Sequence, residues 1–543
     1  MNCYNYFFLG GGNKTQWTYL KHNGPLFPPE YVVHKIPIII NNTKYILPPL
    51  AEEYATMYAK YIDTKYIDSS LFKKNFWKDF KSSLIDINVD SLDKIDFSLI
   101  KRYLDDQKNI KSSMTKEEKK VNKELQKKTE EPYMYCIIDG EKQKVGNYKI
   151  EQPGIFIGRG SHPKLGRIKK RIYPKDIILN LDTEAPIPKI NIPNQKWKSI
   201  IHDKTVIWLA TWKDNITSKN KYIFTSLESF FKSKSDEEKF NLARKLKKKI
   251  NNIRYLYESE LNSDNLKKKQ LATALYFIDN LALRVGGKKD SKEQADTVGV
   301  TSLRVEHITL LENNTIKLDF LGKDCIRYYK KINVHSKVYN NLKEFIKNKT
   351  KKEELFDLIT ATSLNEYLNS FLPGLTAKVW RTFNASFLFQ KELDKLISNK
   401  KLEMFNETNE RVNFFISIFN QANTEVALLC NHQKTVNSNL DNTIDKINEM
   451  IKKLKKNKDK YKEQKNHDKV KQIEIKIKIL KLKKENKIKM KNVSLSTSKN
   501  NYIDPRIIFA FVKKYDIPIE KLFTEQLIKR FSWASVVDKD FKF

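Results

Sequence analysis

Residues 435–490 restrict the possible folds of this chain more than any other segment. Apolar residues recur there at steps of three and four, in one run of Ile444, Ile447, Ile451 and Leu454 and a second run of Val470, Ile473, Ile477 and Leu480. This spacing places the apolar side chains on one narrow face of each of two helices. A Lys/Asn-rich break near 457–468 separates the runs. We therefore predict an antiparallel helical hairpin whose other faces are mostly lysine.

The whole chain is strongly basic. Its 543 residues contain 102 Lys and Arg against 65 Asp and Glu, which gives a formal net charge of +37. Such an excess favours a polyanionic partner, with nucleic acid ahead of an acidic membrane. Part of the excess reflects the joint over-use of Lys, Asn and Ile that AT-rich coding produces. Charge alone therefore suggests a nucleic-acid partner without proving one.

Features that the sequence lacks exclude several classes of protein. No apolar run approaches the ~20 residues that span a bilayer, and residues 1–12 lack the basic start and long apolar core of a secretory signal. The cysteines are scattered without a C-x-x-C pair, at Cys3, Cys136, Cys325 and Cys430. This pattern argues against a zinc module and against a disulfide framework. We expect a soluble, intracellular protein with no membrane partner.

The pattern of apolar residues changes near residue 231. Up to about residue 200 it predicts mixed structure, with strands at 31–40, 133–138 and 205–212, helices at 49–62 and 69–80, and an exposed charged helix at 112–131. Beyond residue 231 it predicts mostly helices, including 271–283, 338–347, 363–371, 376–397 and 407–429, with strands at 302–307 and 316–321. A chain of this length supports two to four domains.

Several catalytic motifs are missing. The chain has no G-x-x-x-x-G-K-[ST] phosphate loop, its glycine-rich run at 154–160 lacks the Rossmann spacing, and no HExxH or acidic triad marks a catalytic metal site. Cleavage of nucleic acid by this chain would therefore proceed without ATP and without a catalytic metal.

Metal-free phosphodiester transfer needs a nucleophile held in line, cationic donors for the non-bridging oxygens and an acid for the leaving 5′-oxygen. Tyr502, within residues 498–506, is a candidate nucleophile, and a tyrosyl ester conserves the bond energy for resealing. The other candidates are Arg284 after an apolar helix, Lys323 beside a glycine at a strand end, Arg381 in a helix and His432 after one. Each alone has an ordinary structural explanation, such as a helix cap or a solvated turn. Composition and periodicity do not show that the five converge.

From about Trp17 to Phe543 the chain resembles the eukaryotic nuclear type IB DNA topoisomerases. The resemblance rests on short strings in one order: 21–27 (KHNGPLF), 74–79 (KNFWKD), 153–156 (PGIF), 158–164 (GRGSHPK), 295–299 (ADTVG), 302–307 (SLRVEH) and the strings around the five candidates. It implies an α+β multidomain protein, a bilobed DNA clamp with a mixed α/β cap and a mainly helical, tyrosine-recombinase-like catalytic core. The implied parts are an extension, 1–12; a DNA-binding subdomain, 13–30 with 117–230; a cap, 31–116; the catalytic subdomain, 231–434; a basic antiparallel coiled-coil linker, 435–490; and a small helical C-terminal domain, 491–543.

The resemblance also implies what the chain does. A monomer in the nucleus would relax positive and negative supercoils of double-stranded DNA without ATP, through single-strand cleavage, a 3′-phosphotyrosine, strand rotation and religation. No cofactor or metal is expected to be required, and Mg²⁺ would be at most stimulatory. Tyr502 would attack the phosphate, while Arg284 and Arg381 would hold its non-bridging oxygens. His432 would donate to the same oxygens, and Lys323 would protonate the leaving 5′-oxygen.

Further site residues follow from the same resemblance. The implied DNA contacts are Arg159, Lys164, Asp324, Lys499 and Asn501. Of these, Arg159, Asp324 and Asn501 line the pocket where camptothecin-type drugs bind in the family, so we expect drug sensitivity.

Three departures from the family pattern stand out. Ile157 replaces a usual arginine, which removes a charge near the minor groove, and Ser496 replaces a usual glycine at the hinge before Tyr502. We expect Ser496 to stiffen that hinge and to alter religation or drug response. Only about a dozen residues precede the match, where the family commonly has a long charged tail. Either a longer tail is missing, or nuclear import uses another basic segment such as the hairpin.

Two other classes of protein share parts of this pattern. A tyrosine recombinase uses nearly the same chemistry but requires synapsis of several protomers, and the cap and linker hairpin argue against it. An architectural DNA-binding protein would need none of the five candidate residues, and all five are present.

Overall fold

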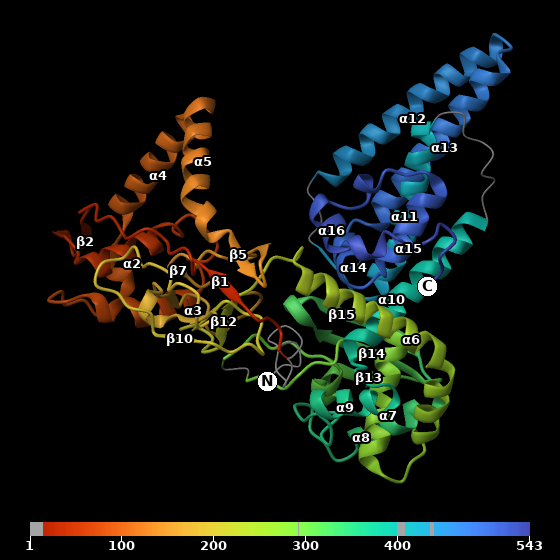
Figure 1. Cartoon of the computed structure of the whole chain (residues 1–543), viewed down its shortest axis with the longest axis horizontal. Coiled ribbons are helices and arrows are strands. Elements are labelled where there is room, and N and C mark those ends of the chain that lie inside the picture. The colour runs from red at the N-terminus through yellow and green to blue at the C-terminus, as the bar shows by residue number, and fades with distance from the viewer. Residues whose placement is uncertain (1–14, 291–292, 399–407, 435–438) are drawn as a thin grey trace. The chain divides into compact units, whose positions relative to one another are not determined.

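The computed structural model describes residues 15–290, 293–398, 408–434 and 439–543. The chain divides into two units, each with its own internal contacts (Figure 1). Unit 1 comprises residues 1–229 and 289–296, and unit 2 comprises residues 230–288 and 297–543. The mixed α/β, multidomain fold class is confirmed, whereas the finer domain boundaries remain predictions.

Unit 1 combines several small sheets with short helices. Its strands are β1 (Leu20–His22), β2 (Ile38–Ile40), β3 (Thr43–Tyr45), β4 (Ile95–Asp96), β5 (Tyr135–Ile138), β6 (Glu141–Lys144), β7 (Gly154–Ile155), β8 (Ile168–Lys169), β9 (Ile178–Asn180), β10 (Ser199–Ile201), β11 (Ala210–Lys213) and β12 (Asn220–Ile223). They pair in the orders β1-β5-β6, β3-β2-β4, β7-β8 and β10-β9-β11-β12, and of these pairs only β9 with β10 is parallel.

The helices of unit 1 are α2 (Pro49–Ala59), α3 (Ser70–Phe80), α4 (Ser98–Ser113) and α5 (Lys116–Glu130). Phe72, Phe76 and Phe80 recur every fourth residue on α3 and are fully buried, so this face of the helix forms the centre of a core. The predicted exposed helix at 112–131 corresponds to α5, which has no buried residue and begins at a capping box of Thr115 and Glu118.

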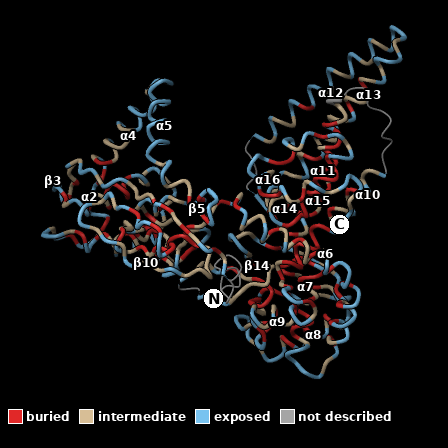
Figure 2. Tube along the Cα trace, viewed as in Figure 1, coloured by how far each residue is buried: buried red, intermediate tan, exposed pale blue. Residues whose placement is uncertain are grey.

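Unit 2 is mainly helical, and most of its described helices pack around one large core. Its helices are α6 (Phe230–Glu260), α7 (Leu266–Leu281), α8 (Ser336–Ile346), α9 (Ala361–Phe371), α10 (Ala377–Ser398), α11 (Thr408–Leu429), α12 (Leu440–Glu463), α13 (His467–Lys489), α14 (Leu495–Asn501), α15 (Pro505–Tyr515) and α16 (Glu525–Arg530). An antiparallel sheet of β13 (Ile308–Leu310), β14 (Thr315–Leu321) and β15 (Arg327–Asn333) packs against them. The core includes residues from α6 to the buried Phe543 at the C-terminus, and buried residues recur along the helices of this unit (Figure 2).

The predicted hairpin is confirmed as α12 and α13, which lie side by side and extend away from the rest of unit 2 (Figure 1). Ile447, Ile473 and Ile477 of the predicted seam are buried between the helices, while the outer faces are exposed (Figure 2). The base of α13 is fixed on α11, because the buried Asn486 amide donates to the Ser417 carbonyl (3.1 Å) and hydroxyl (2.7 Å). Within the described ranges, no helix is both long and apolar enough to span a membrane.

Three predicted strands are wrong in whole or in part. Within 31–40 only β2 is a strand, because the buried Glu52 carboxylate accepts the N–H groups of His34 (2.7 Å) and Lys35 (2.8 Å). These donors are therefore not available to a neighbouring strand. Within 205–212 only the end belongs to β11, because Asp203 accepts the Thr205 N–H (2.9 Å) and hydroxyl (2.6 Å) in a local turn.

The third error concerns residues 302–307, which form parts of two 3₁₀ turns, Val300–Ser302 and Val305–His307, rather than a strand. The Nδ1 atom of His307 accepts the Arg304 N–H (2.9 Å), and this local bond replaces a strand ladder. The strand β15, which the sequence reading missed, pairs with β14 along its whole length and completes the hairpin beside Lys323.

Candidate active site

Tyr502 lies at the junction of two short helices in unit 2. It follows the last residue of α14, and α15 begins three residues later, where the Asp504 side chain accepts the Arg506 N–H (3.0 Å) and Pro505 occupies the first turn. Asp and Pro are favoured at these two positions of a helix start. The buried Asn423 of α11 holds α14 in place, because it donates to the Leu495 carbonyl (3.1 Å) and accepts from the Ser498 hydroxyl (2.6 Å).

The helix α10 brings Arg381 to this junction. Its neighbour Trp380 donates to the Asp279 carboxylate (3.1 Å), and Asn384 donates to the Ile278 (3.0 Å) and Asp279 (2.9 Å) carbonyls at the end of α7. The side chains in these bonds are buried, and the carbonyls belong to the backbone of α7. Each bond pairs a buried donor with an acceptor, so together they fix α10 on α7.

Arg381 joins three separate segments. Its guanidinium is 3% exposed and donates to the Ala282 carbonyl (2.6 Å), the Cys430 carbonyl (3.4 Å) and the phenol oxygen of Tyr502 (2.9 Å). The guanidinium carbon also lies 4.7 Å from the centre of the Tyr502 ring. A buried cation is thus held directly against the phenol of the predicted nucleophile.

This environment changes the acidity of Tyr502. Burial of the phenol raises its pKa, but the positive charges of Arg381, Arg284 and Lys378 outweigh burial and leave the pKa lower than that of an ordinary tyrosine. A lowered pKa makes phenolate, the nucleophilic form, more accessible near neutral pH.

His432 also lies beside the phenol ring of Tyr502. Its ring centre is 5.3 Å from that of Tyr502, and neither ring nitrogen has a hydrogen-bond partner among the described residues. Burial, with smaller contributions from Arg381 and Arg284, lowers the pKa of His432 to about 3, so the imidazole is neutral at physiological pH. A neutral imidazole retains one N–H donor for a bound ligand.

Arg284 follows the end of α7 in an extended segment. The Ala282 backbone is left-handed (φ 48°) and ends the helix, and the Arg284 carbonyl then accepts the Val300 N–H (2.9 Å). The segment passes so close to residues 298–300 that a Cβ on Gly286 would lie 2.7 Å from the Gly299 backbone. Glycine at both positions therefore permits the approach that places Arg284 at the site.

Lys323 lies in the turn between β14 and β15. Asp324 (φ 67°) and Cys325 (φ 59°) both have left-handed backbone conformations, which are strained for residues other than glycine and often occur at functional sites. The turn end of this hairpin is tied to the segment around His432, because the side-chain amides of Asn431 (3.4 Å) and Gln433 (3.3 Å) both donate to the carbonyl of Arg327, the first residue of β15.

A pocket of about 710 Å³, including the open solvent at its mouth, unites these side chains. Arg284, Lys323, Arg381 and His432 all line it, and Tyr502 adjoins it through Arg381. The structure therefore brings together the five residues whose convergence the sequence did not show. Sequence reasoning did not single out Ser386, Asn431 or Gln433, although all three lie within strings that it used.

The other predicted site residues are distributed over both units. Arg159 in unit 1 is exposed, and Asp324 and Asn501 in unit 2 are exposed near the pocket and the tyrosine. The Lys164 ammonium forms an ion pair with Glu293 and donates to the Ile216 carbonyl (2.6 Å), while that of Lys499 donates to the Leu522 carbonyl. Contact of these two lysines with DNA stays a prediction, and an ammonium has three N–H donors, so it can donate to a phosphate beside such a partner.

The two substitutions that depart from the family pattern, Ile157 and Ser496, have simple local settings. Ile157 is half-buried and packs against the core of unit 1 around α2 and α3. Ser496 is exposed in the first turn of α14, with its hydroxyl 3.3 Å from that of Ser494. Its effect on the hinge stays a prediction.

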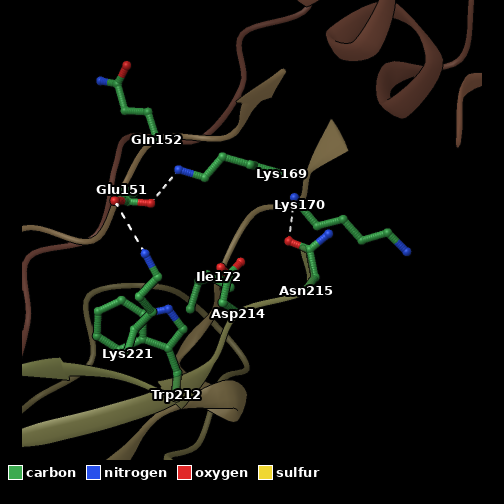
Figure 3. A pocket seen from close by; sticks show the side chains of 9 residues that line it. All are labelled: Glu151, Gln152, Lys169, Lys170, Ile172, Trp212, Asp214, Asn215 and Lys221. Atoms are coloured by element: carbon green, nitrogen blue, oxygen red, sulfur yellow. Dashed lines mark hydrogen bonds and ion pairs between the residues drawn. The ribbon is translucent and has the colours of Figure 1, made fainter. Parts of the chain in front are cut away.

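A second pocket, of about 300 Å³, lies in unit 1 (Figure 3). Lys169 and Lys221 both pair with the Glu151 carboxylate there, whereas the Lys170 side chain points away from it (Figure 3). None of the predicted site residues lines this pocket. In the described parts of the chain, no group of three or more His, Cys, Asp or Glu side chains is arranged to hold a metal ion.

In unit 2 a buried tyrosine lies beside two arginines, a histidine and a lysine, a set of donors suited to binding an anionic group. Three family models match the chain: the DNA-binding fragment of eukaryotic DNA topoisomerase I at residues 15–225, the catalytic core of the same family at 228–465 and the C-terminal topoisomerase domain at 474–543. The chain belongs to the eukaryotic DNA topoisomerase I family.

Individual relatives agree with this assignment. DNA topoisomerase 1 beta of Arabidopsis thaliana is 40% identical over 560 residues, which cover 98% of this chain and 60% of the relative. DNA topoisomerase 1 of Caenorhabditis elegans is 41% identical over 549 residues (96% of this chain, 66% of the relative), and that of Homo sapiens is 39% identical over 560 residues (97% and 72%). The chain thus spans about 60% to 72% of the length of these relatives.

Proposed function

We propose that the chain is a type IB DNA topoisomerase that relaxes positive and negative supercoils of double-stranded DNA without ATP. The observation that carries the proposal is the 2.9 Å hydrogen bond from Arg381 to the Tyr502 phenol, in a pocket also lined by Arg284, Lys323 and His432. The net charge of +37 agrees with a DNA substrate. The proposal includes a monomeric enzyme acting in the nucleus with no required cofactor, Mg²⁺ being at most stimulatory.

In the proposed reaction the Tyr502 oxygen attacks the scissile phosphorus as phenolate, having lost its proton to solvent. The bond from phosphorus to the 5′-oxygen breaks, Lys323 gives that oxygen a proton, and a 3′-phosphotyrosine remains. Arg284, Arg381 and the N–H of neutral His432 stabilise the non-bridging oxygens, because charge develops on them in the transition state. Rotation of the free 5′ end relaxes the duplex, and attack by the 5′-hydroxyl reverses the steps and returns the proton to Lys323.

The proposal also assigns the remaining predicted residues. Arg159, Lys164, Asp324, Lys499 and Asn501 would contact DNA near the cleavage site. Arg159, Asp324 and Asn501 would line the drug pocket once DNA is bound, which makes camptothecin-type trapping of the cleaved complex an expected property.

A covalent trapping experiment tests the proposal. Wild-type protein is incubated with supercoiled plasmid in EDTA without ATP, samples are quenched in denaturant, and the DNA-linked peptide is identified by mass spectrometry. We expect relaxation of both positively and negatively supercoiled plasmids, and a DNA 3′ end joined to Tyr502. Attachment to another residue, or a 5′-linked adduct, would contradict the assigned chemistry.

We expect the pH dependence of cleavage to come from Tyr502 rather than His432. The rate should rise with pH as the phenol ionises and level off below the ordinary tyrosine pKa of about 10, because the arginines lower the pKa of Tyr502. His432, with its pKa lowered to about 3, stays neutral throughout. Single-turnover cleavage by wild type and His432→Gln between about pH 5 and 9 checks this expectation. A step near about 6.5 that only the wild type shows would contradict it.

A further inference from the structure

Ser386 lies on α10 and is fully buried against the backbone of Tyr502. Its hydroxyl donates to the Tyr502 carbonyl (3.0 Å) and accepts the N–H of Asp504 (2.9 Å). One side chain thus satisfies two backbone groups that neither α14 nor α15 satisfies, because Tyr502 (φ −124°, ψ −33°) lies outside regular helix.

The same helix also holds the other end of this tyrosine. Arg381, five residues before Ser386, donates to the phenol oxygen (2.9 Å). A second core helix, α6, contributes Lys239, which donates to the carbonyl of Asn501 (3.0 Å) and is itself paired with the buried Asp236 (3.1 Å). The core of unit 2 therefore holds the side chain of Tyr502 and also the peptide groups on both sides of it.

The two contacts from α10 differ in what happens to them during the proposed reaction. The phenol oxygen becomes an ester oxygen on cleavage and a leaving group on religation, so its bond to Arg381 must change. The bonds of Ser386 to the backbone involve no reacting atom and can persist in both directions. They therefore set the position from which the phenol reaches phosphorus, and an error of about 1 Å in such a position can cost about 100-fold in rate.

We infer that Ser386 is a positioning residue that places Tyr502 for both cleavage and religation. The inference rests on the proposed function, since it concerns the nucleophile of that reaction. It predicts that loss of the hydroxyl slows the chemical steps in both directions without weakening DNA binding.

Thr382 offers a matched control on the same helix. It is also fully buried, and its hydroxyl donates to the Lys378 carbonyl (3.1 Å) of its own helix rather than to the tyrosine segment. Thr382→Val removes a buried hydroxyl with nearly the same shape retained, so it reproduces the loss of one buried hydrogen bond without affecting the Tyr502 backbone.

The experiment measures single-turnover cleavage of a DNA substrate whose downstream end dissociates after cleavage, with religation started separately by adding a 5′-hydroxyl strand. We expect Ser386→Ala to lower both rate constants by about 10- to 100-fold. The fraction of protein that reacts should be unchanged, and DNA affinity should stay within about twofold. Thr382→Val removes one hydrogen bond rather than two, so it should lower the melting temperature by a smaller amount, and it should keep the wild-type rate constants.

Ser386→Cys provides a second test if the alanine variant folds poorly, because sulfur fills similar space but is a weak donor and acceptor. It should slow both steps in the same way.

Wild-type rate constants in either variant, or a fall only in the reacting fraction, would overturn the inference and leave Ser386 a purely structural residue. If wild type forms no covalent complex, the proposed function fails and the inference with it. Normal wild-type chemistry with an unaffected Ser386 variant overturns the inference alone.

Discussion

Tyr502→Phe is expected to abolish relaxation and covalent trapping while leaving DNA binding intact. Phenylalanine keeps the ring that packs beside His432 and beneath the Arg381 guanidinium, but it removes the oxygen that would attack phosphorus. Loss of the nucleophile removes the whole covalent route, so the rate should fall by about 10⁴-fold or more. Plasmid relaxation, denaturant trapping and a gel-shift titration on the same preparations measure the three properties.

The structure supplies a matched control for this change. Tyr329 on β15 is 54% exposed and does not line the pocket, so Tyr329→Phe should relax plasmid at the wild-type rate. Tyr502→Phe also removes a buried partner of Arg381, which costs about 1–3 kcal/mol of stability, so thermal unfolding of both variants is compared. A folded Tyr502→Phe protein that still relaxes plasmid at a rate comparable with wild type would refute the nucleophile assignment.

Helical segments with a clear apolar face could be predicted from the sequence alone. The predicted helix at 376–397 corresponds to α10 (Ala377–Ser398). The predicted break near 457–468 contains the turn between α12 and α13 but is too long, because α12 continues to Glu463 and α13 begins at His467. These elements depend on contacts three or four residues apart, which a sequence pattern records directly.

Strands were predicted less well because their hydrogen bonds depend on distant partners. At 31–40 the alternation predicts one strand, but a buried carboxylate from α2, Glu52, accepts the backbone N–H groups of His34 and Lys35. Nothing within residues 31–40 indicates that Glu52 lies there. The same limitation explains why β15, whose pairing with β14 defines the Lys323 turn, was missed.

The candidate site was predictable as a set of residues but not as a geometry. Resemblance identified Arg381 and Tyr502, which are 121 residues apart in sequence, yet their 2.9 Å contact depends on how α10 packs on α7 and how α14 packs on α11. Ser386 could not be found by residue type, because a serine inside a helix usually has only a local role. Its position against two backbone groups of the tyrosine segment became visible only in the fold.

Lys323→Ala is expected to reduce cleavage of ordinary DNA by about 10²- to 10⁴-fold, the range typical of loss of a general acid. Lys323 is exposed at a turn, so its removal leaves no cavity in the core. The amides of Asn431 and Gln433 still hold the turn end of the hairpin at the Arg327 carbonyl, so the pocket should keep its shape. Single-turnover cleavage rates measure the effect, and Lys331→Ala, at an exposed lysine of β15 outside the pocket, is the control.

A substrate with sulfur in place of the leaving 5′-oxygen distinguishes proton donation from a purely electrostatic role. A thiol has a pKa of about 8.5, far below that of an alcohol, so a thiolate leaves without being protonated. Lys323→Ala should therefore cleave the sulfur substrate nearly as fast as wild type does. Lys323→Arg keeps the charge but holds its proton more tightly. It should therefore cleave ordinary DNA slowly and the sulfur substrate at the wild-type rate. Equal defects on both substrates would mean that Lys323 stabilises charge on the phosphate, and the acid would have to be sought among the other residues that line the pocket.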